Sequence, residues 1–365
     1  MKLRSKFLLT FSILLIATNA FAATKVTYTV TQGGTYPSLS SAIAQAKTDY
    51  SNLVTSDVQI DIVIDGSWSA ADTVAVSISG FTTDATRYIN IYTTATARHN
   101  GIYGGKSTAY RLEVGGFTGS VLGVDNNYIT VNGLQIAATF SYGGNTIVWG
   151  DNSANYGDYG TITNCLIKIK NTGQYGDMFA GIKCSYVSGF KIYNNIIFSF
   201  NNGGSGTGGP IGIYIYNSYG TTHASYAYEN TVYFSGNSHD TGMNLAQSSG
   251  GTLYAKNNIS NGATTDFVFG TNVTHTNNLS KDATGEIQAT LSFVAPASYD
   301  CHLAYTDTAA IDAGATLGSP YNVDIDGDSR PQGSAYDIGA DEYISTTTTY
   351  YIMRSIGAGI GVGIK

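Results

Sequence analysis

Phe190-Lys-Ile-Tyr-Asn194-Asn195-Ile-Ile-Phe-Ser-Phe200 consists of a strand-like segment, a turn at asparagine and a second strand-like segment. We term this pattern the strand–Asn–strand motif. Repetition of one supersecondary unit at a period of a few tens of residues indicates a solenoid. Because the repeated unit is all strand, the motif predicts an all-β chain that winds as a β-helix. Further copies occupy residues 128–136, 161–169, 226–234, 253–259 and 274–279.

A second series of strands lies between these motifs. Successive members are 24 to 35 residues apart, and each interval holds one such strand and the two strands of a motif. Three strands per interval predict the triangular coil of a single-stranded parallel β-helix, with roughly eight coils stacked about 4.8 Å apart. The uneven period indicates loops of variable length, which cost little entropy. By alternation, the first inward residues of this series are Leu122, Ile147, Ile182, Ile213, Met243 and Phe267.

The asparagine of the motif has a structural and a functional interpretation. Asn tolerates the left-handed backbone region that a sharp corner needs, and its amide can bond to the Asn of the next coil. Alternatively, a row of amides binds a glycan. Turn preferences favour the structural interpretation. The predicted corner residues are Asn132, Asn164, Asn195, Asn230, Asn258 and Asn278.

Alternation along each strand assigns the remaining side chains to the inside or the outside. Three cysteines cannot form a disulfide framework, and Cys184 takes an inward position beside Ile182, so we expect a buried structural thiol there. Besides the series above, the predicted inward residues are Ile129, Val131, Leu134, Ile136, Ile162, Ile169, Phe190, Ile192, Phe198, Phe200, Ile215, Val232, Phe234 and Leu245.

The first residues have the pattern of a secretory signal peptide. Basic residues up to Lys6, an apolar run over 7–17 and the Ala20-Phe-Ala22 site predict cleavage after Ala22 and export. The apolar run is too short to span a bilayer comfortably. Cleavage removes three basic residues and no acidic one, which changes the net charge from −7 to −10. Such a surface repels nucleic acid and anionic membranes at long range.

Residues 30–47 predict a strand, a glycine turn and a short helix capped by Ser38 or Ser40. Residues 58–64 alternate as a further strand. The open end of a solenoid exposes unpaired strand edges, so we expect this helix to cap the first coil. Its predicted apolar face consists of Leu39, Ile43 and Ala46.

Together with the coils, Gly33-Gly-Thr-Tyr-Pro-Ser-Leu-Ser-Ser-Ala-Ile43 resembles the opening of right-handed parallel β-helix proteins of the pectate-lyase-like superfamily. The resemblance implies a right-handed solenoid body. It implies no single reaction, because this fold hosts lyases, hydrolases, esterases and adhesins.

A second resemblance concerns the C-terminal segments Ala310-Ile-Asp-Ala-Gly314, Asp324-Ile-Asp-Gly-Asp-Ser-Arg-Pro331 and Asp337-Ile-Gly-Ala-Asp-Glu-Tyr343. They resemble the closing block of bacterial exported β-helix proteins of the choice-of-anchor type. This resemblance implies a secreted or cell-surface protein, and with the coils it covers most of residues 25–343.

We therefore divide the chain into a signal peptide (1–22), a β-helix domain (23–343) and a linker with an apolar, glycine-rich tail (344–365). Within the domain we expect an N-terminal cap at about 25–66, Asn-cornered coils at about 112–280 and a C-terminal closing block at about 300–343. Arg354 and several glycines interrupt the tail, so we expect no transmembrane span in the mature chain.

Two types of carbohydrate cleavage each require particular residues, which can be sought in the sequence. A polysaccharide lyase of this fold needs a base near calcium-binding acids, and a glycoside hydrolase needs two carboxylates that flank the scissile bond. Lys183 is expected to point outward in a row with Val148, Tyr214, Asn244 and Val268, which has one base and no carboxylate. A polar turn is the structural interpretation of the adjacent pair His239 and Asp240. The catalytic candidates that remain are Lys183, Asp177, Asp240 and His239.

The sequence leaves two possible ligand-binding sites undecided. Asp324, Asp326 and Asp328 alternate in a polar stretch, which indicates either calcium binding or a structural turn paired with Arg330. Outward tyrosines offer ring faces that stack on sugars, although they also brace neighbouring coils. The candidate ligand-binding residues are Tyr193, Tyr214, Tyr216, Tyr233 and Asn244.

Three candidate functions are consistent with this sequence. The first is an exported surface or secreted protein that binds extracellular polysaccharide without catalysis. The second is a polysaccharide lyase or another carbohydrate-active enzyme, and the third is a structural or adhesive rod with a protein partner. The absence of arginine between residues 112 and 329 favours the first and third over the second. We expect a monomer, no nucleic-acid partner and no cofactor other than calcium.

Overall fold

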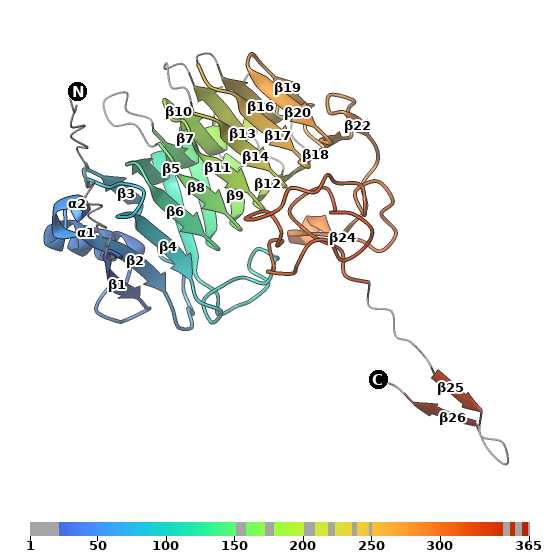
Figure 1. Ribbon diagram of the computed structural model, residues 1–365, viewed down its shortest axis with the longest axis horizontal. Helices are drawn as coiled ribbons and strands as arrows, with labels where there is room; N and C mark the ends of the chain where they lie inside the picture. The colour runs from blue at the N-terminus through green and yellow to red at the C-terminus, as the bar shows by residue number, and fades with distance from the viewer. Residues whose placement is uncertain are drawn as a thin grey trace, which may run out of the picture.

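The computed structural model describes residues 22–150, 158–171, 179–200, 209–217, 223–235, 239–247, 250–345, 351–354 and 360–363. In these residues the chain winds as a right-handed parallel β-helix, in which strands of successive coils pair in parallel (Figure 1). From β8 to β19, each coil contributes one strand to a nine-stranded sheet and two strands to a 13-stranded sheet. The predicted coil of three strands is therefore confirmed.

The nine-stranded sheet contains the strand that precedes each corner. Its spatial order is also its order in the chain. Its members are β1 (Thr24–Val30), β2 (Val58–Ile64), β4 (Ile89–Thr93), β6 (Ile129–Asn132), β8 (Thr161–Thr163), β11 (Lys191–Tyr193), β14 (Ser225–Tyr228), β17 (Leu253–Lys256) and β20 (Val273–Thr276).

The 13-stranded sheet contains the other two strands of each coil. β5 (Arg111–Asp125) and β7 (Gln135–Trp149) are 15-residue strands that span both positions and join the two series. The strands after the corner are β9 (Leu166–Asn171), β12 (Ile196–Phe200), β15 (Thr231–Ser235), β18 (Ile259–Asn261), β21 (Leu279–Ser280) and β22 (Ile287–Gln288). The third strands are β3 (Val76–Ser79), β10 (Phe179–Ser185), β13 (Pro210–Asn217), β16 (Thr241–Gln247) and β19 (Thr265–Phe269).

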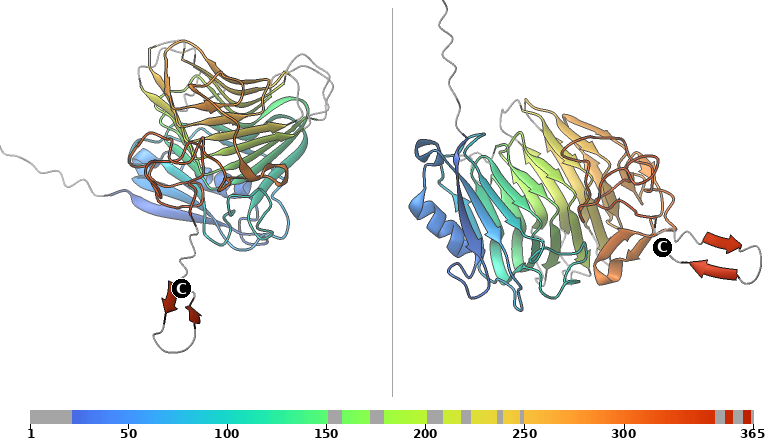
Figure 2. Two further views of the ribbon diagram at one scale, coloured as in Figure 1. Left: turned by 90° about the vertical axis from the view of Figure 1, so that its right-hand side faces the viewer. Right: turned by 60° about the horizontal axis from the view of Figure 1, so that its bottom comes forward.

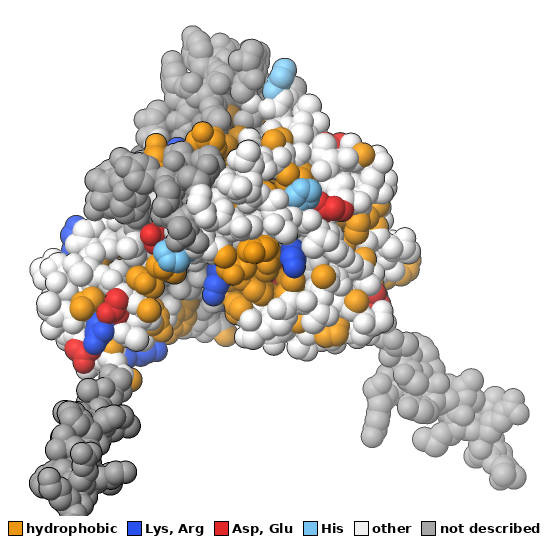
Figure 3. All heavy atoms as spheres, turned by 45° about the horizontal axis from the view of Figure 1, so that its top comes forward, with side chains coloured by type: hydrophobic (Ala, Val, Ile, Leu, Met, Phe, Trp, Pro, Cys, Tyr) orange, Lys and Arg blue, Asp and Glu red, His pale blue; other side chains and the backbone are white. Residues whose placement is uncertain are grey.

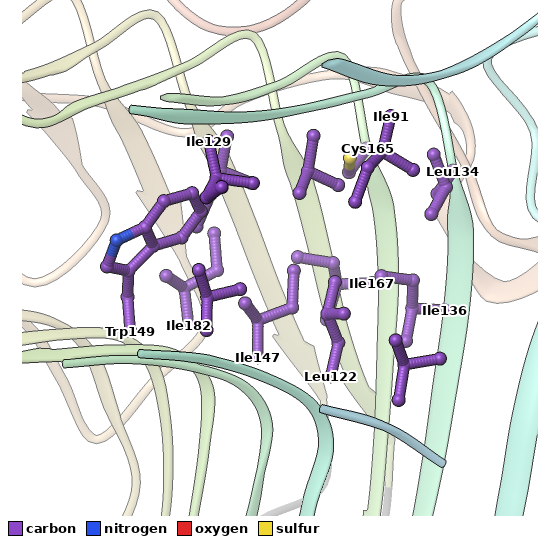
Figure 4. Close-up of a cluster of buried hydrophobic side chains, with 14 of the residues drawn as sticks. Ile91, Leu122, Ile129, Leu134, Ile136, Ile147, Trp149, Cys165, Ile167 and Ile182 are labelled. Atoms are coloured by element: carbon purple, nitrogen blue, oxygen red, sulfur yellow. The ribbon is translucent and has the colours of Figure 1, made fainter. Parts of the chain in front are cut away.

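The core between the sheets contains the predicted inward residues. The series from Leu122 to Phe267 is paired residue by residue across successive strands, and each member is at most 3% exposed. Figure 4 shows Leu122, Ile147 and Ile182 in the same interior space as side chains from the other strands. The other inward residues confirmed in this core are Ile129, Val131, Leu134, Ile136, Ile162, Ile169, Phe190, Ile192, Ile215, Val232, Phe234 and Leu245.

The prediction that Phe198 points inward is wrong. In β12, Ile197 belongs to the solenoid core, and Phe198 lies in a separate apolar cluster outside it. Phe198 is still buried, because the ring of Tyr299 packs edge-on against it at 5.6 Å. The side chain of Phe200 lies outside the described residues. All three cysteines are free and buried, which confirms the buried thiol at Cys184.

At the four corners from Asn195 to Asn278, two neighbouring residues divide the roles that were predicted for a single Asn. There the left-handed residue is followed at once by the residue whose side chain points along the stack. Of the six predicted corner residues, Asn164 alone is recorded with positive φ, at 54°. Asn195, Asn230, Asn258 and Asn278 each follow a left-handed residue, and Asn132 precedes one. The left-handed residues are Gly133, Asn164, Asn194, Glu229, Asn257 and Asn277.

The predicted amide ladder is present. Asn195 Nδ2 donates to Asn230 Oδ1 at 3.0 Å, and Asn230 Nδ2 donates to Asn258 Oδ1 at 3.0 Å. Asn258 Nδ2 donates to Asn278 Oδ1 at 2.8 Å, where the ladder ends on the Glu286 carboxylate. A separate step joins Asn164 Nδ2 to Asn132 Oδ1 at 3.1 Å. Each amide both donates and accepts, so the row fixes the register of the coils.

The N-terminal cap is also confirmed. Helices α1 (Leu39–Asp49) and α2 (Leu53–Ser56) lie at the N-terminal, blue end of the stack (Figures 1 and 2). Ser38 begins α1 with a capping box, in which its hydroxyl accepts from the Ser41 backbone N–H at 3.1 Å. The predicted face of Leu39, Ile43 and Ala46 is buried.

The C-terminal block, residues 300–343, folds back along the outside of the coils, where Figure 1 shows its red-brown loops beside β12 and β18. It begins with β24 (Asp300–Leu303), which pairs antiparallel with β23 (Phe293–Ala295) after a 3₁₀ turn (Pro296–Ser298). Cys301, Ile325 and Ala340 of the block pack against outward residues of β9 and β12. This packing explains why Phe198 is buried although it points away from the core.

The left-handed corner residues hold the C-terminal block by hydrogen bonds. Asn194 Nδ2 donates to the Val323 carbonyl at 2.6 Å. Asn257 both donates to the Ala315 carbonyl at 2.8 Å and accepts from its N–H at 2.9 Å. Asn277 Nδ2 donates to the Ala313 carbonyl at 3.1 Å. The corner therefore serves two interfaces: one amide row joins coil to coil, and the next joins the coils to the block.

Glu229 is the exception in that outward row. It is fully buried, and neither carboxyl oxygen accepts a well-formed hydrogen bond from the described residues. Burial raises the pKa of Glu229 to about 8, and the charge of Arg330 and a contact with the Asn257 side chain only partly offset this rise. At neutral pH the side chain is therefore mainly a neutral carboxylic acid.

We expect Glu229→Gln to remove a pH dependence of stability. The folded pKa is raised, so the folded state holds the proton more tightly than the unfolded state between about pH 4.5 and 8. Stability therefore falls as the pH rises through this window, by about 1.4 kcal/mol per unit. Urea unfolding at pH 5, 6, 7 and 8 measures this slope. Equal slopes for the wild type and Glu229→Gln would contradict the assignment.

The predicted linker and tail are described only in part. Tyr351–Arg354 (β25) and Ile360–Gly363 (β26) form an antiparallel pair. Among the described residues, no helix has the length and apolar composition needed to cross a bilayer. Residues 1–21 of the predicted signal peptide lie outside the described residues.

Candidate ligand-binding face

The outer face of the nine-stranded sheet is lined by tyrosines. Alternation turns every second residue outward, and parallel register sets equivalent residues side by side. Tyr226 pairs with Tyr254, and their rings stack at 5.6 Å with an interplanar angle of 15°. The rings of Tyr128 and Tyr159 stack at 4.9 Å and 11°. We term this surface the tyrosine face, and it consists of Tyr88, Tyr92, Tyr128, Tyr159, Tyr193, Tyr226, Tyr228 and Tyr254.

The C-terminal block forms one wall of a groove over this face. The ring of Tyr321 packs edge-on against Tyr228 at 4.9 Å and against Tyr193 at 5.0 Å. Burial raises the pKa of Tyr228 to about 12, so its hydroxyl stays protonated at neutral pH. We term this feature the Lys–Tyr groove; it encloses about 400 Å³ and is lined by Lys191, Tyr226, Tyr228, Lys256, Thr316, Leu317, Ser319, Pro320 and Tyr321.

Two lysines make this groove positive in a chain whose net charge is −7. Lys191 lies beside Tyr226 in the register of β11 and β14, and Lys256 lies beside Tyr228 in that of β14 and β17. The two lysine strands are two pairings apart, about 10 Å across the sheet. The lining residues include no carboxylate. The groove therefore combines aromatic rings with separated positive charges.

A smaller hollow lies farther along the same face. It encloses about 260 Å³ and is lined by Tyr88, Tyr128 and Tyr159 together with Ala85, Asn90 and Thr130. Figure 3 shows one face of the molecule, on which hydrophobic side chains, tyrosines included, gather in patches with Lys or Arg side chains near their margins. The tyrosine face thus offers two aromatic hollows along one sheet.

The predicted ligand-binding residues fall into two groups. Tyr214, Tyr216 and Asn244 lie together on the outer face of β13 and β16, where Tyr214 pairs with Asn244. The rings of Tyr214 and Tyr216 are parallel at 6.3 Å. Tyr193 and Tyr233 point outward as expected, but the rings of Tyr321 and Phe293 pack against them. For these two, the bracing interpretation fits the structure better than free stacking on a sugar.

The predicted row at Lys183 is confirmed. Lys183 pairs with Val148 on one side and with Tyr214 on the other, and the row continues through Asn244 to Val268. No carboxylate occupies it. Asp177 lies outside the described residues.

The loop candidates have structural contacts. Asp240 is buried, and its Oδ1 accepts from the backbone N–H and the hydroxyl of Thr264. His239 is an exposed residue in the left-handed region, with φ 65°. This arrangement fits the polar-turn interpretation of the pair.

The predicted calcium ligands are not gathered around one point. Asp324 Oδ1 accepts from the backbone N–H groups of Asp326, Gly327 and Asp328, at 2.8 to 2.9 Å. Among the described residues, these three carboxylates do not form a group of close ligand atoms, whereas Asp326 forms one with His302 and Asp341. The predicted pairing of Arg330 with these acids is also wrong. Arg330 Nη1 forms its ion pair with Glu342, at 3.2 Å.

A cleft on the outer face of β5, β7 and β9 was not predicted from the sequence. It encloses about 350 Å³, and its walls include Tyr103, Glu113, Lys168 and Lys170. Lys168 Nζ lies 4.4 Å from the ring centre of Tyr299, and the Tyr103 hydroxyl donates to Glu113 at 2.9 Å. Tyr103 and Tyr299 come from loops far apart in the sequence, so no local pattern predicts their meeting.

No family model matches the chain, and no curated protein matches its sequence. The pectin methylesterase of Aspergillus niger is similar in structure over 76% of this chain and 95% of its own, with 11% identity and a TM-score of 0.39. The pectate lyase Pel9A is similar over 88% of this chain and 97% of its own, with 15% identity and a TM-score of 0.33. The parallel β-helix assignment rests on the sheet topology of this chain.

Proposed function

We propose that this chain is an exported β-helix protein that binds extracellular polysaccharide on its tyrosine face, without catalysis. The stacked rings of Tyr226 and Tyr254 on this face are the main support, and Tyr226 also lines the Lys–Tyr groove. Export is proposed from the signal-peptide pattern of residues 1–22. The choice-of-anchor resemblance stays a prediction.

The chemistry of the face suits an extended sugar chain. Tyrosine rings present an apolar face that packs on the C–H groups of a pyranose, and their hydroxyls bond to its oxygens. The spacing between coils, about 4.8 Å, is close to the length of one sugar ring, so successive coils can contact successive sugars. Lys191 and Lys256 add positive charge at both sides of the rings, which favours a glycan with carboxylate or sulfate groups.

We expect Tyr226→Ala to weaken polysaccharide binding about 5-fold, because one aromatic stacking contact is worth about 1 kcal/mol. A glycan array on the mature chain identifies the ligand, and calorimetry then measures both affinities. Tyr305→Ala is the matched control, because Tyr305 is 79% exposed and belongs to the C-terminal block. Unchanged binding by Tyr226→Ala would contradict the proposed face, and an array with no ligand would favour the adhesive rod with a protein partner.

A carbohydrate-active enzyme is the second candidate, and the cleft of Glu113, Lys168 and Lys170 is the observation that favours it. This cleft combines a carboxylate with two amines in a concave site, whereas the Lys183 row has no acid. Incubation with the glycan found above, with and without calcium, tests for unsaturated sugar products. Products that depend on Lys168 or Lys183 would replace the non-catalytic proposal.

A further inference from the structure

His302 of β24 lies between two carboxylates. Its Nδ1 is 2.5 Å from Asp300 Oδ1, and its Nε2 is 2.7 Å from Asp326 Oδ2. Asp326 belongs to the turn at 324–328, which is remote in sequence from β24. Burial alone lowers the pKa of His302, but bonds and charges from Asp326, Asp341 and Asp300 outweigh it and raise the pKa to about 10. Both ring nitrogens are thus held in fixed directions.

A third carboxylate, Asp341, faces the same point. Its side chain is only 6% exposed, and Oδ2 accepts from the Leu303 backbone N–H at 2.7 Å. Its other oxygen accepts no hydrogen bond from the described residues. One ligand atom from each of His302, Asp326 and Asp341 lies within 4.8 Å of the others. A buried carboxylate therefore has a ligand atom close to those of a histidine and a second carboxylate.

The side chains at this centre are donor groups for a cation. Asp300 and Asp326 contact the two ring nitrogens of His302, and Asp341 lies beside them. The side chains of His302 and Asp326 are 23% and 25% exposed, whereas Asp341 is buried. The centre therefore combines one imidazole with carboxylates at a place that solvent can reach.

The backbone of a separate loop closes the centre on one side. A Cβ placed on Gly101 would lie 2.3 Å from His302 Nε2 and 2.8 Å from Asp326 Oδ2. Gly101 also has φ of +72°, which disfavours any side chain. The loop therefore lies directly over His302 Nε2 and Asp326 Oδ2, and at Gly101 there is no room for a side chain.

We propose that His302 Nε2, Asp326 and Asp341 bind a divalent transition-metal ion of the zinc class. Two atoms each about 2.1 Å from one tetrahedral ion are about 3.4 Å apart, so His302 Nε2 and Asp326 Oδ2, which are now 2.7 Å apart, would separate by roughly 0.7 Å when the ion binds. The ion replaces the proton on Nε2, and Asp300 orients the ring through Nδ1–H, as outer carboxylates do for metal-bound histidines. Imidazole with carboxylates suits zinc better than calcium, which takes six to eight oxygen ligands.

Such an ion joins three segments: β24, the turn at 324–328 and the chain at residue 341. It therefore fixes the C-terminal block against itself and beneath the loop of Gly101. This inference does not depend on the proposed sugar binding, because the centre shares no residue with the Lys–Tyr groove.

The test uses the full mature chain, stripped of metal and then titrated with zinc or with cobalt as a visible probe. We expect one ion per chain, cobalt absorption bands of nitrogen and oxygen ligands, and a higher melting temperature with zinc. His302→Gln and Asp341→Asn should each weaken binding at least about 100-fold. His275→Gln is the matched control, because His275 also pairs with a carboxylate, Glu286, but outside this centre.

Circular dichroism shows whether each variant is folded, and Asp341→Asn keeps side-chain volume in case His302→Gln does not fold. The proposal would be overturned if the folded wild-type protein showed no saturable zinc binding and no change in melting temperature. Undiminished binding by Asp341→Asn would overturn it equally, because the ion would then be bound elsewhere.

Discussion

Replacing Asn230 by alanine is expected to lower the free energy of unfolding by about 3 kcal/mol. Asn230 lies in the middle of the amide ladder, where its Oδ1 accepts from Asn195 and its Nδ2 donates to Asn258. The same Nδ2 contacts the carbonyls of Ile192 and Tyr228 at 2.9 and 3.0 Å. Truncation takes one partner from each of these buried groups and removes the acceptor of the Asn195 backbone N–H, in a core that water does not reach. Denaturant unfolding followed by circular dichroism measures the loss.

Asn132→Ala is the matched control for this ladder. Asn132 is half-buried and accepts from Asn164 and Arg98, so water can replace its partners and the cost should be about 1 kcal/mol or less. Asn230→Asp should cost more than Asn230→Ala, because a carboxylate would face the acceptor oxygen of Asn258. If Asn230→Ala and Asn132→Ala cost the same, the ladder is not a stabilising feature of the core.

Arg330→Met is expected to destabilise the C-terminal block. Arg330 and Glu342 have fully buried side chains, and Arg330 also donates to the carbonyls of Asp337 and Gly339. Removing the cation leaves the buried Glu342 carboxylate without a counter-charge and takes a donor from two carbonyls, which costs about 3 to 5 kcal/mol. Hydrogen exchange resolved by segment measures this cost, and protection should fall over 300–343 more than over 129–280.

The surface ion pair of Arg87 with Asp57 and Asp84 provides the control. Water solvates these groups, so Arg87→Met should cost about 1 kcal/mol or less. In Arg330→Met with Glu342→Gln, the buried charge is also removed while an acceptor for the Gln332 and Asp337 N–H groups stays, and part of the lost protection should return. Equal exchange in Arg330→Met and the wild type would show that the apolar contacts alone hold the block.

The pairing of residues on adjacent coils could be predicted from the sequence. The inward series from Leu122 to Phe267 and the outward row through Lys183 occur in the predicted register, since alternation and period fix which residues meet. The capping box at Ser38 is local in the same way. In each of these cases, the partner is a near neighbour in the chain or the equivalent residue one coil away.

The backbone conformation of the corner asparagines could not be predicted from the sequence. The sequence places Asn194 beside Asn195, and Asn257 beside Asn258, but does not say which takes the left-handed conformation. A similar limit applies to the tyrosine face. Tyr226 and Tyr254 recur before successive corners, which is a signal in the sequence, but their stacking depends on register.

The chain's own repeat and alternation were enough to determine a parallel β-helix, its core and its cap, because each depends on contacts within a coil or between neighbouring coils. Tertiary structure alone decided that residues 300–343 fold back over the coils, bury Phe198 and wall one side of the Lys–Tyr groove. The same folding brought His302, Asp326 and Asp341 together. The physical reason is that docking between segments distant in sequence depends on the shape and polarity of surfaces that exist only after the coils have stacked.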